Sequence, residues 1–235
     1  MKVTTRSTNT QPKIPILYED NHLLVIDKPA GVLSQEDKSG APDVLTLCKE
    51  WLKDKYDKPG NVFLGLVHRL DQPVSGLMVL AKTSKAASRL SEQMRNHAIN
   101  KTYWALVYGI TPETGTLVHH LSKDKKTNTV QVFNSQKSFT KEAKLSFTTL
   151  KQNAHFSLVE VELITGRPHQ IRAQFSKSGF PLWGDYRYGE KEGKQGKELA
   201  LKAVKLDFLH PTTKEKMSFN TLPPRQKQNL HNNNQ

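Results

Sequence analysis

The chain has 235 residues, a formal net charge of +13 at pH 7 and 36% hydrophobic residues, enough for a packed core, which excludes a fully disordered protein. No apolar run approaches the roughly 20 residues of a membrane-spanning helix, and no secretory signal opens the chain, so no membrane partner is expected. The single cysteine, Cys48, fits a cytoplasmic compartment. The positive charge favours a polyanionic partner, most often nucleic acid, although a solvated basic surface gives the same composition.

The two ends of the chain read as flexible tails. Residues 1–13 are polar without apolar periodicity, and residues 222–235 are rich in Pro, Gln and Asn. Between them neither a linker nor an internal repeat occurs, so residues 14–221 are predicted to form one domain.

The first half of this domain predicts two strands, a helix, a strand and a second helix. Apolar residues 14–18 and 22–26 flank a polar turn and indicate a hairpin. A helix is expected to open at Pro42, because apolar residues follow it at spacings of three and four, with Cys48 on the core face. Residues 75–81 read as an apolar strand, and Thr83 or Ser84 is expected to cap the next helix.

The second half predicts mostly strands, at residues 102–108, 129–133, 143–147 and 156–163, with an exposed turn at 123–128. Pro168 is expected to begin a helix that runs through Gln174 and ends before Gly179. Residues 189–197 are expected to form a mobile loop. The fold class is therefore α+β, with a mixed, mainly antiparallel central sheet and flanking helices.

Two polar segments stand out as candidate sites. Arg69 and Asp71 lie on a predicted loop that feeds the strand at residue 75, a common place for catalytic groups. An Asp beside an Arg on a loop is, however, usually a turn or a surface pair. Arg167 precedes the predicted helix, whose amides would attract an anion, and Arg172 follows within it. A capped structural helix with solvated arginines is the alternative there.

Five motifs occur in order along the chain: Lys28-Pro29-Ala30-Gly31, His68-Arg69-Leu70-Asp71 with Ser75-Gly76, Lys101-Thr102-Tyr103, Gly166 to Arg172, and Gly184-Asp185 with Tyr188-Gly189. Together they resemble the RNA pseudouridine synthases of the large-ribosomal-subunit (RluA-type) family, over residues 14–219. Residues 201–203 also resemble the closing strand of this family, although Lys202 stands where many members have His.

The resemblance implies three catalytic residues. Asp71 matches the catalytic aspartate, Arg172 the arginine that stabilises its ionised form, and Tyr103 the tyrosine that stacks on uracil or moves a proton. In the implied reaction uracil leaves C1′ of a uridine, rotates and rejoins through C5 without a cofactor. A carboxylate can act there as a nucleophile or as a base, and the sequence leaves both routes open.

The resemblance further implies a structured RNA substrate, tRNA or rRNA, whose target uridine is flipped out of the stack. Arg69 matches the side chain that fills the vacated space or holds the extruded nucleotide, while Lys28 and Arg167 are candidate phosphate contacts. Many relatives carry an RNA-binding module ahead of the first motif; residues 1–13 are too few for one, so a stand-alone, monomeric catalytic domain is expected. No metal site is expected, since the adjacent His119 and His120 point to opposite faces of a strand.

Two other classes of protein stay open. A non-catalytic RNA-binding or ribosome-assembly protein could share the fold, although it should then have lost Asp71, Tyr103 or Arg172. A glycosidase would need a second carboxylate near Asp71, and none lies in that motif.

Overall fold

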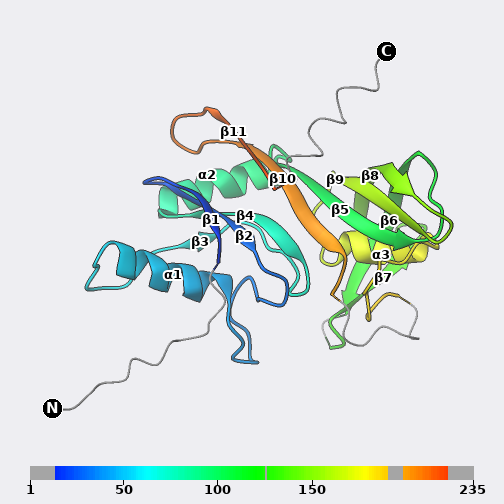
Figure 1. Ribbon diagram of the computed structural model, residues 1–235, viewed down its shortest axis with the longest axis horizontal. Helices are drawn as coiled ribbons and strands as arrows, with labels where there is room; N and C mark the ends of the chain where they lie inside the picture. The colour runs from blue at the N-terminus through cyan, green and yellow to red at the C-terminus, as the bar shows by residue number, and fades with distance from the viewer. Residues whose placement is uncertain (1–13, 125, 190–197, 222–235) are drawn as a thin grey trace.

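A mixed β-sheet organises the molecule (Figure 1). The computed structural model describes residues 14–124, 126–189 and 198–221. In these residues the strand order is β1-β2-β4-β10-β5-β9-β8-β6-β7, with β3 on β4 and β11 on β10. Strands β4 and β10 pair in parallel, and the other strand pairings of the described residues are antiparallel. The predicted fold class is confirmed.

The elements in chain order are β1 (Ile16–Glu19), β2 (Leu23–Lys28), α1 (Val44–Lys55), β3 (Gly65–Leu66), β4 (Ser75–Ala81), α2 (Ser84–Arg95), β5 (Asn100–Tyr108), β6 (Thr114–Asp124), β7 (Thr129–Phe133), β8 (Lys141–Gln152), β9 (Phe156–Leu163), α3 (Gln170–Lys177), β10 (Leu201–Leu209) and β11 (Lys216–Asn220).

Helices α1 and α2 begin at side-chain caps. Asp43 accepts a hydrogen bond from the Thr46 amide, so α1 starts two residues after Pro42 rather than at it. Thr83 accepts from the Ala86 amide and is therefore the cap of α2. The predicted hairpin, both helices and the strand at 75–81 are confirmed.

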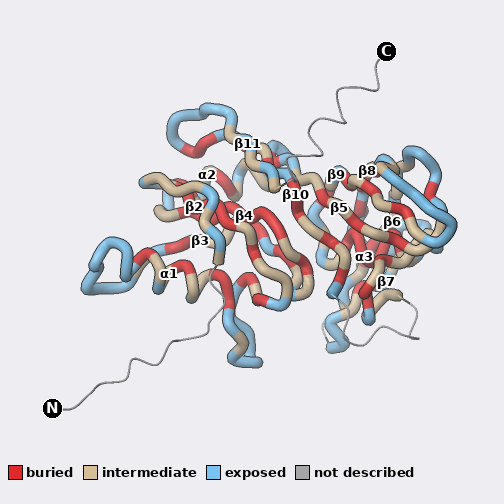
Figure 2. Tube along the Cα trace, in the orientation of Figure 1, coloured by how far each residue is buried: buried red, intermediate tan, exposed pale blue. Residues whose placement is uncertain are grey.

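Apolar side chains fill both faces of the sheet around β2 and β4. Alternate residues of β2 point to opposite faces, so Leu24 and Ile26 join the cluster that includes α1, whereas Leu23 and Val25 join the cluster that includes α2. The first cluster continues across β5, β9 and β8 to Ile171 and Phe175 of α3. Figure 2 shows this buried band through the strands, with exposed residues at the loop tips.

The third helix begins later than predicted. His169 has φ 50°, in the left-handed region, which a continuing α-helix cannot include, so Pro168 lies in a turn and α3 runs from Gln170 to Lys177. Strands β3, β6 and β11 were not predicted, and β8 extends beyond the predicted 143–147 at both ends. The apolar periodicity of β6 is weak because much of it is only half buried.

Gly76 allows the parallel contact that closes the sheet. Its φ is +118°, and a Cβ there would lie 2.2 Å from the backbone oxygen of Ala203. Only glycine lets β4 approach β10 this closely, immediately after the loop that carries Asp71. The glycine of the second motif therefore has a backbone role.

Three expectations fall on parts of the chain that lie outside the described residues: the tails at 1–13 and 222–235, and most of the loop at 189–197. No helix among the described residues is long and apolar enough to cross a membrane.

Candidate active site

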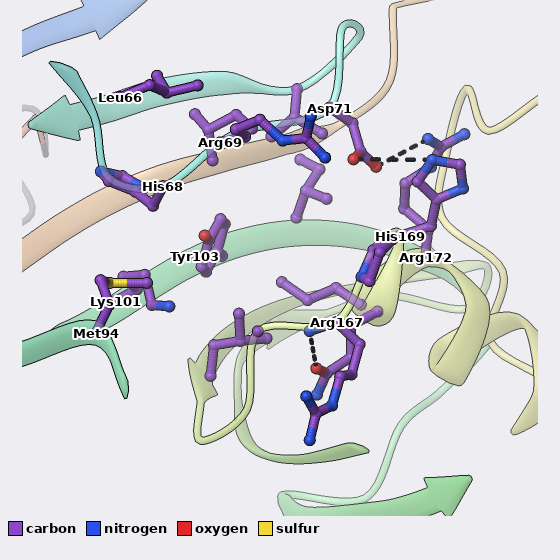
Figure 3. A pocket seen from close by; sticks show the side chains of 18 of the residues that line it. Leu66, His68, Arg69, Asp71, Met94, Lys101, Tyr103, Arg167, His169 and Arg172 are labelled. Atoms are coloured by element: carbon purple, nitrogen blue, oxygen red, sulfur yellow. Dashed lines mark hydrogen bonds and ion pairs between the residues drawn. The ribbon is translucent and has the colours of Figure 1, made fainter. Parts of the chain in front are cut away.

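A cleft of about 530 Å³ lies over the middle of the sheet, between three segments that are distant in sequence. The loop between β3 and β4 forms one wall, the start of β5 forms the floor, and the turn before α3 forms the other wall. Figure 3 shows Asp71, His169 and Arg172 together at one end, His68, Lys101 and Met94 at the other, and Tyr103 between them.

The segment after β2 holds the loop of Asp71 in place. The Ser34 hydroxyl accepts from the Leu70 amide and donates to the Leu70 carbonyl. The Gly31 amide donates to the Gln72 carbonyl at 2.9 Å. These contacts fix the backbone on both sides of Asp71, so the first motif supports the second.

Lys28 belongs to this support. It is fully buried, and its Nζ donates to the carbonyl oxygens of Pro29, Val32 and Gln72. Burial lowers the pKa of Lys28 to about 8, although the nearby Asp71 opposes the shift. The ammonium group of Lys28 is thus buried against three carbonyl oxygens, which argues against the predicted contact of Lys28 with a phosphate.

Arg172 connects the carboxylates of two segments. Its Nη1 donates to Asp71 Oδ2 at 3.2 Å, while Nε and Nη2 donate to the two oxygens of Asp185 at 2.7 and 2.8 Å. Burial opposes the charge on both partners, yet the pairing raises the pKa of Arg172 and lowers that of Asp185. Arg172 therefore stays a cation that is fixed from behind by Asp185 and faces Asp71.

Tyr103 lies on the floor of the cleft. Its side chain is almost fully buried, and burial, followed by the charge of Asp71, raises its pKa above the usual value, so the phenol stays protonated. Burial also lowers the pKa of Lys101. The three residues expected to be catalytic, Asp71, Tyr103 and Arg172, thus line one cleft.

His68 connects the loop of Asp71 to strand β4. Its Nε2 accepts from the Val79 amide at 3.1 Å, and burial lowers its pKa to about 3, with Lys101 adding to the shift. His68 is therefore neutral and anchored to β4.

The two arginines expected to contact RNA both line the cleft. Arg69 is exposed beside Asp71. Arg167 is half buried, and its Nε donates to the Glu142 carbonyl at 2.8 Å. Its amide bonds the Gln170 side chain, so the segment before α3 is fixed.

A second cavity of about 230 Å³ adjoins the cleft and shares Lys123, Arg167 and Pro168 with it. Its lining combines apolar side chains with cations and includes the exposed Phe139 and Lys141. Apolar surface edged by positive charge suits a nucleobase and its phosphate.

The described residues give little support to a glycosidase or to a metal site. Among those that line the cleft, Asp71 is the one carboxylate, and Asp185 is buried and paired with Arg172, so the carboxylate pair of a glycosidase is lacking. Within the described ranges no cluster of three or more His, Cys, Asp or Glu could hold a metal ion. His119 instead contacts the Gln174 side chain.

Sequence reasoning gave no role to His169, Asp185 or Tyr188, although all three stand in the matched motifs. Asp185 fixes Arg172, and the Tyr188 hydroxyl lies 2.6 Å from His169 Nδ1. Their presence in the matched motifs could have pointed to a role. Arg172 lies 13 residues from Asp185, and His169 lies 19 residues from Tyr188, so these contacts are seen only in the folded protein.

Comparisons with known proteins point to one family. Residues 22–177 match the family model described as RNA pseudouridylate synthase. An uncharacterized RNA pseudouridine synthase, YlyB, of Bacillus subtilis (strain 168) is 36% identical over 217 residues, covering 88% of this chain and 68% of that protein. The ribosomal large subunit pseudouridine synthase C of Vibrio vulnificus (strain CMCP6) is 32% identical, covering 87% of this chain and 64% of that protein.

Solved structures show the same fold. Human RNA pseudouridylate synthase domain containing 4 superposes with a TM-score of 0.75 at 23% identity, covering 92% of each chain. Human RNA pseudouridylate synthase domain containing 1 gives a TM-score of 0.72 at 25% identity, covering 90% of this chain and 84% of the other. The chain spans about two thirds of the length of the first curated relatives it matches.

Proposed function

Because this chain belongs to the RNA pseudouridine synthase family, we propose that it isomerises uridine to pseudouridine within a structured RNA, tRNA or rRNA. The observation that carries the proposal is the placement of Asp71, whose carboxylate faces the cleft opposite the Arg172 cation, with the Tyr103 ring on the floor. In this proposal Asp71 initiates the reaction and the hydrogen bond from Arg172 orients its carboxylate.

The reaction needs few groups. The bond between C1′ and N1 breaks, the uracil rotates, and a bond from C1′ to C5 replaces it. N1 gains a proton and C5 loses one, so the sum of atoms is unchanged and no cofactor enters. Asp71 serves as nucleophile or as base in the first step, and both routes require an ionised carboxylate close to the ribose. The buried ring of Tyr103 offers a surface on which the detached uracil can stack.

The target base must leave its stack to reach Asp71, because the cleft is walled on two sides. Arg69 is exposed at the rim beside Asp71 and is suited to fill the space that the flipped nucleotide vacates. A guanidinium plane stacks on neighbouring bases of any type, so this contact depends little on the base sequence around the target.

The adjoining cavity extends the path of the RNA strand. With uridine at Asp71, the phosphate of the next nucleotide falls near Lys123 and Arg167, which line both cavities. The next base can then lie against Phe139, which is 63% exposed, with Lys141 near its phosphate. The cations along this path are part of the positive net charge that favours a polyanionic partner.

Removing the charge of Lys141 is expected to weaken RNA binding and to reduce its salt dependence. The slope of log affinity against log salt should fall in magnitude by about 0.7 to 0.9 in Lys141→Gln, the contribution of one phosphate contact. Lys151→Gln is the matched control, because Lys151 is an exposed lysine on the same strand, about 33 Å along it. Fluorescence anisotropy with a short oligouridylate measures the affinity of the two variants and its salt dependence. Equal slopes for the two variants would contradict the proposed path.

Isomerase activity is tested by tritium release from transcribed rRNA and tRNA that carry tritium at C5 of uridine. Release into water, with pseudouridine recovered after nuclease digestion, is the expected result. RNA binding without release would instead favour the non-catalytic RNA-binding protein.

A further inference from the structure

Behind Asp71, two side chains that the reaction has not used form a chain of hydrogen bonds. The Val130 amide donates to the Tyr188 hydroxyl at 2.8 Å, and that hydroxyl lies 2.6 Å from His169 Nδ1. Since the oxygen of Tyr188 already accepts from Val130, its own hydrogen is free to point to Nδ1. The imidazole then carries its proton on Nε2.

Nε2 of His169 faces the catalytic carboxylate. It lies 3.9 Å from Asp71 Oδ1, the oxygen that Arg172 leaves free, since Arg172 donates to Oδ2. The separation is longer than a hydrogen bond, and contacts of this kind tighten when substrate occupies a site. The backbone of His169 is in the left-handed region, which turns the ring away from the axis of α3 and toward the cleft.

Burial keeps the imidazole neutral. The charged and titratable groups around it are Asp71, Arg172, Arg187, Lys123 and Tyr188. Burial lowers the pKa of His169 and the three cations lower it further, against the opposing effect of Asp71. His169 is therefore a neutral hydrogen-bond donor and not a second cation at the site.

We propose that His169 is a positioning residue: its Nε2–H, set by the Tyr188 hydroxyl, orients Oδ1 of Asp71 while Arg172 orients Oδ2. The inference rests on the proposed function, since it assigns a role within that reaction. A carboxylate held at both oxygens cannot rotate, so one oxygen is presented to the ribose at a fixed angle.

One short turn anchors both contacts to Asp71. The amides of Arg187 and Tyr188 donate to Asp185 Oδ1, Asp185 holds Arg172, and Tyr188 holds His169. The Arg172 guanidinium also lies over the Tyr188 ring, 5.2 Å from its centroid. The motif Gly184 to Gly189 thus acts on Asp71 through two side chains without lining the cleft itself.

Two substitutions at His169 separate positioning from a backbone role. The amide nitrogen of glutamine stands as many bonds from Cβ as Nε2, whereas that of asparagine corresponds to Nδ1 and does not reach Asp71. Asparagine, however, tolerates the left-handed backbone better than glutamine. A purely structural residue would therefore be replaced better by asparagine, and a positioning residue better by glutamine.

The expected result is that His169→Asn lowers kcat by about 10-fold to 100-fold with little change in KM, whereas His169→Gln stays within about threefold of the unchanged protein. Equal activities, or a better asparagine variant at matched thermal stability, would overturn the proposal.

Nitrogen-15 NMR of the histidine rings tests the same inference without any RNA. Nε2 of His169 should carry the proton at pH 7, and Tyr188→Phe should remove this preference while it keeps the ring over Arg172. A proton on Nδ1 in the unchanged protein would overturn the inference, whereas the expected tautomer in a protein that releases no tritium would count against the proposed function alone.

Discussion

Replacing Asp71 by asparagine is expected to lower tritium release by at least about 10³-fold, because an amide is neither a nucleophile nor a base at neutral pH. Asparagine has nearly the shape of aspartate, so the loop that Ser34 and Gly31 fix should keep its course. Arg172 keeps Asp185 as its partner, and no buried cation is left unpaired. The loss is therefore chemical and not structural.

Two companion measurements make this result specific. Affinity for a short oligouridylate should stay within about twofold in Asp71→Asn, since the phosphate contacts lie elsewhere in the cleft. Asp71→Glu keeps the carboxylate but displaces it by one methylene, and a loss of about 10²-fold is expected from the displacement alone. Undiminished tritium release from Asp71→Asn would refute the assignment of Asp71 and leave the proposed mechanism without its first step.

The frame of the site was predictable from the sequence because its elements obey local rules. The strand at 156–163 and the cap at Thr83 each depend on neighbours within a few residues, and the structure confirms both. The sheet class followed from the same local patterns. Strand β6, which lacks a continuous apolar face, was missed because its position depends on pairing with β7 and β8.

The surroundings of the site residues were harder to predict from the sequence. Lys28 and Arg167 look alike in sequence, each a cation beside a proline, yet the first is fully buried among carbonyl oxygens and the second lines the cleft. Only the fold decides which of the two reaches solvent. The start of α3 was misplaced because proline favours a first helical turn, whereas His169 occupies a left-handed conformation that links its ring to Tyr188.

The largest effect on stability is expected at Asp185. Asp185→Asn removes the carboxylate that holds the buried Arg172 guanidinium with two hydrogen bonds, and the partly exposed Asp71 at 3.2 Å is then its remaining carboxylate. The cost is expected to approach the roughly 3–5 kcal/mol of unfolding free energy that breaking a buried ion pair takes. The amide also turns a donor toward the guanidinium, which adds repulsion. Because Arg172 then loses its anchor, activity should fall together with stability.

The stability that Asp185 contributes should depend on pH, and the direction follows from the shift in its pKa. Although burial opposes it, the pairing with Arg172 lowers the pKa of Asp185 in the folded protein, so its contribution to stability is complete above the unfolded pKa of about 3.9. The contribution is lost as the pH falls from there through the folded pKa. The difference in unfolding free energy between Asp185→Asn and the unchanged protein should therefore be largest near pH 7 and shrink below pH 4.

Asp27 provides the matched control, since it also pairs with one cation but does so near the surface. Its contact with Lys202 is 2.9 Å long, and the two side chains are 23% and 39% exposed. Asp27→Asn should cost less than about 1 kcal/mol, because water screens the pair and solvates the cation that is left. Denaturant unfolding of the two variants from pH 3 to pH 7 measures the contrast. Equal losses would mean that Asp185 acts as a simple surface charge, and the anchoring of Arg172 behind Asp71 would have to be sought in the backbone.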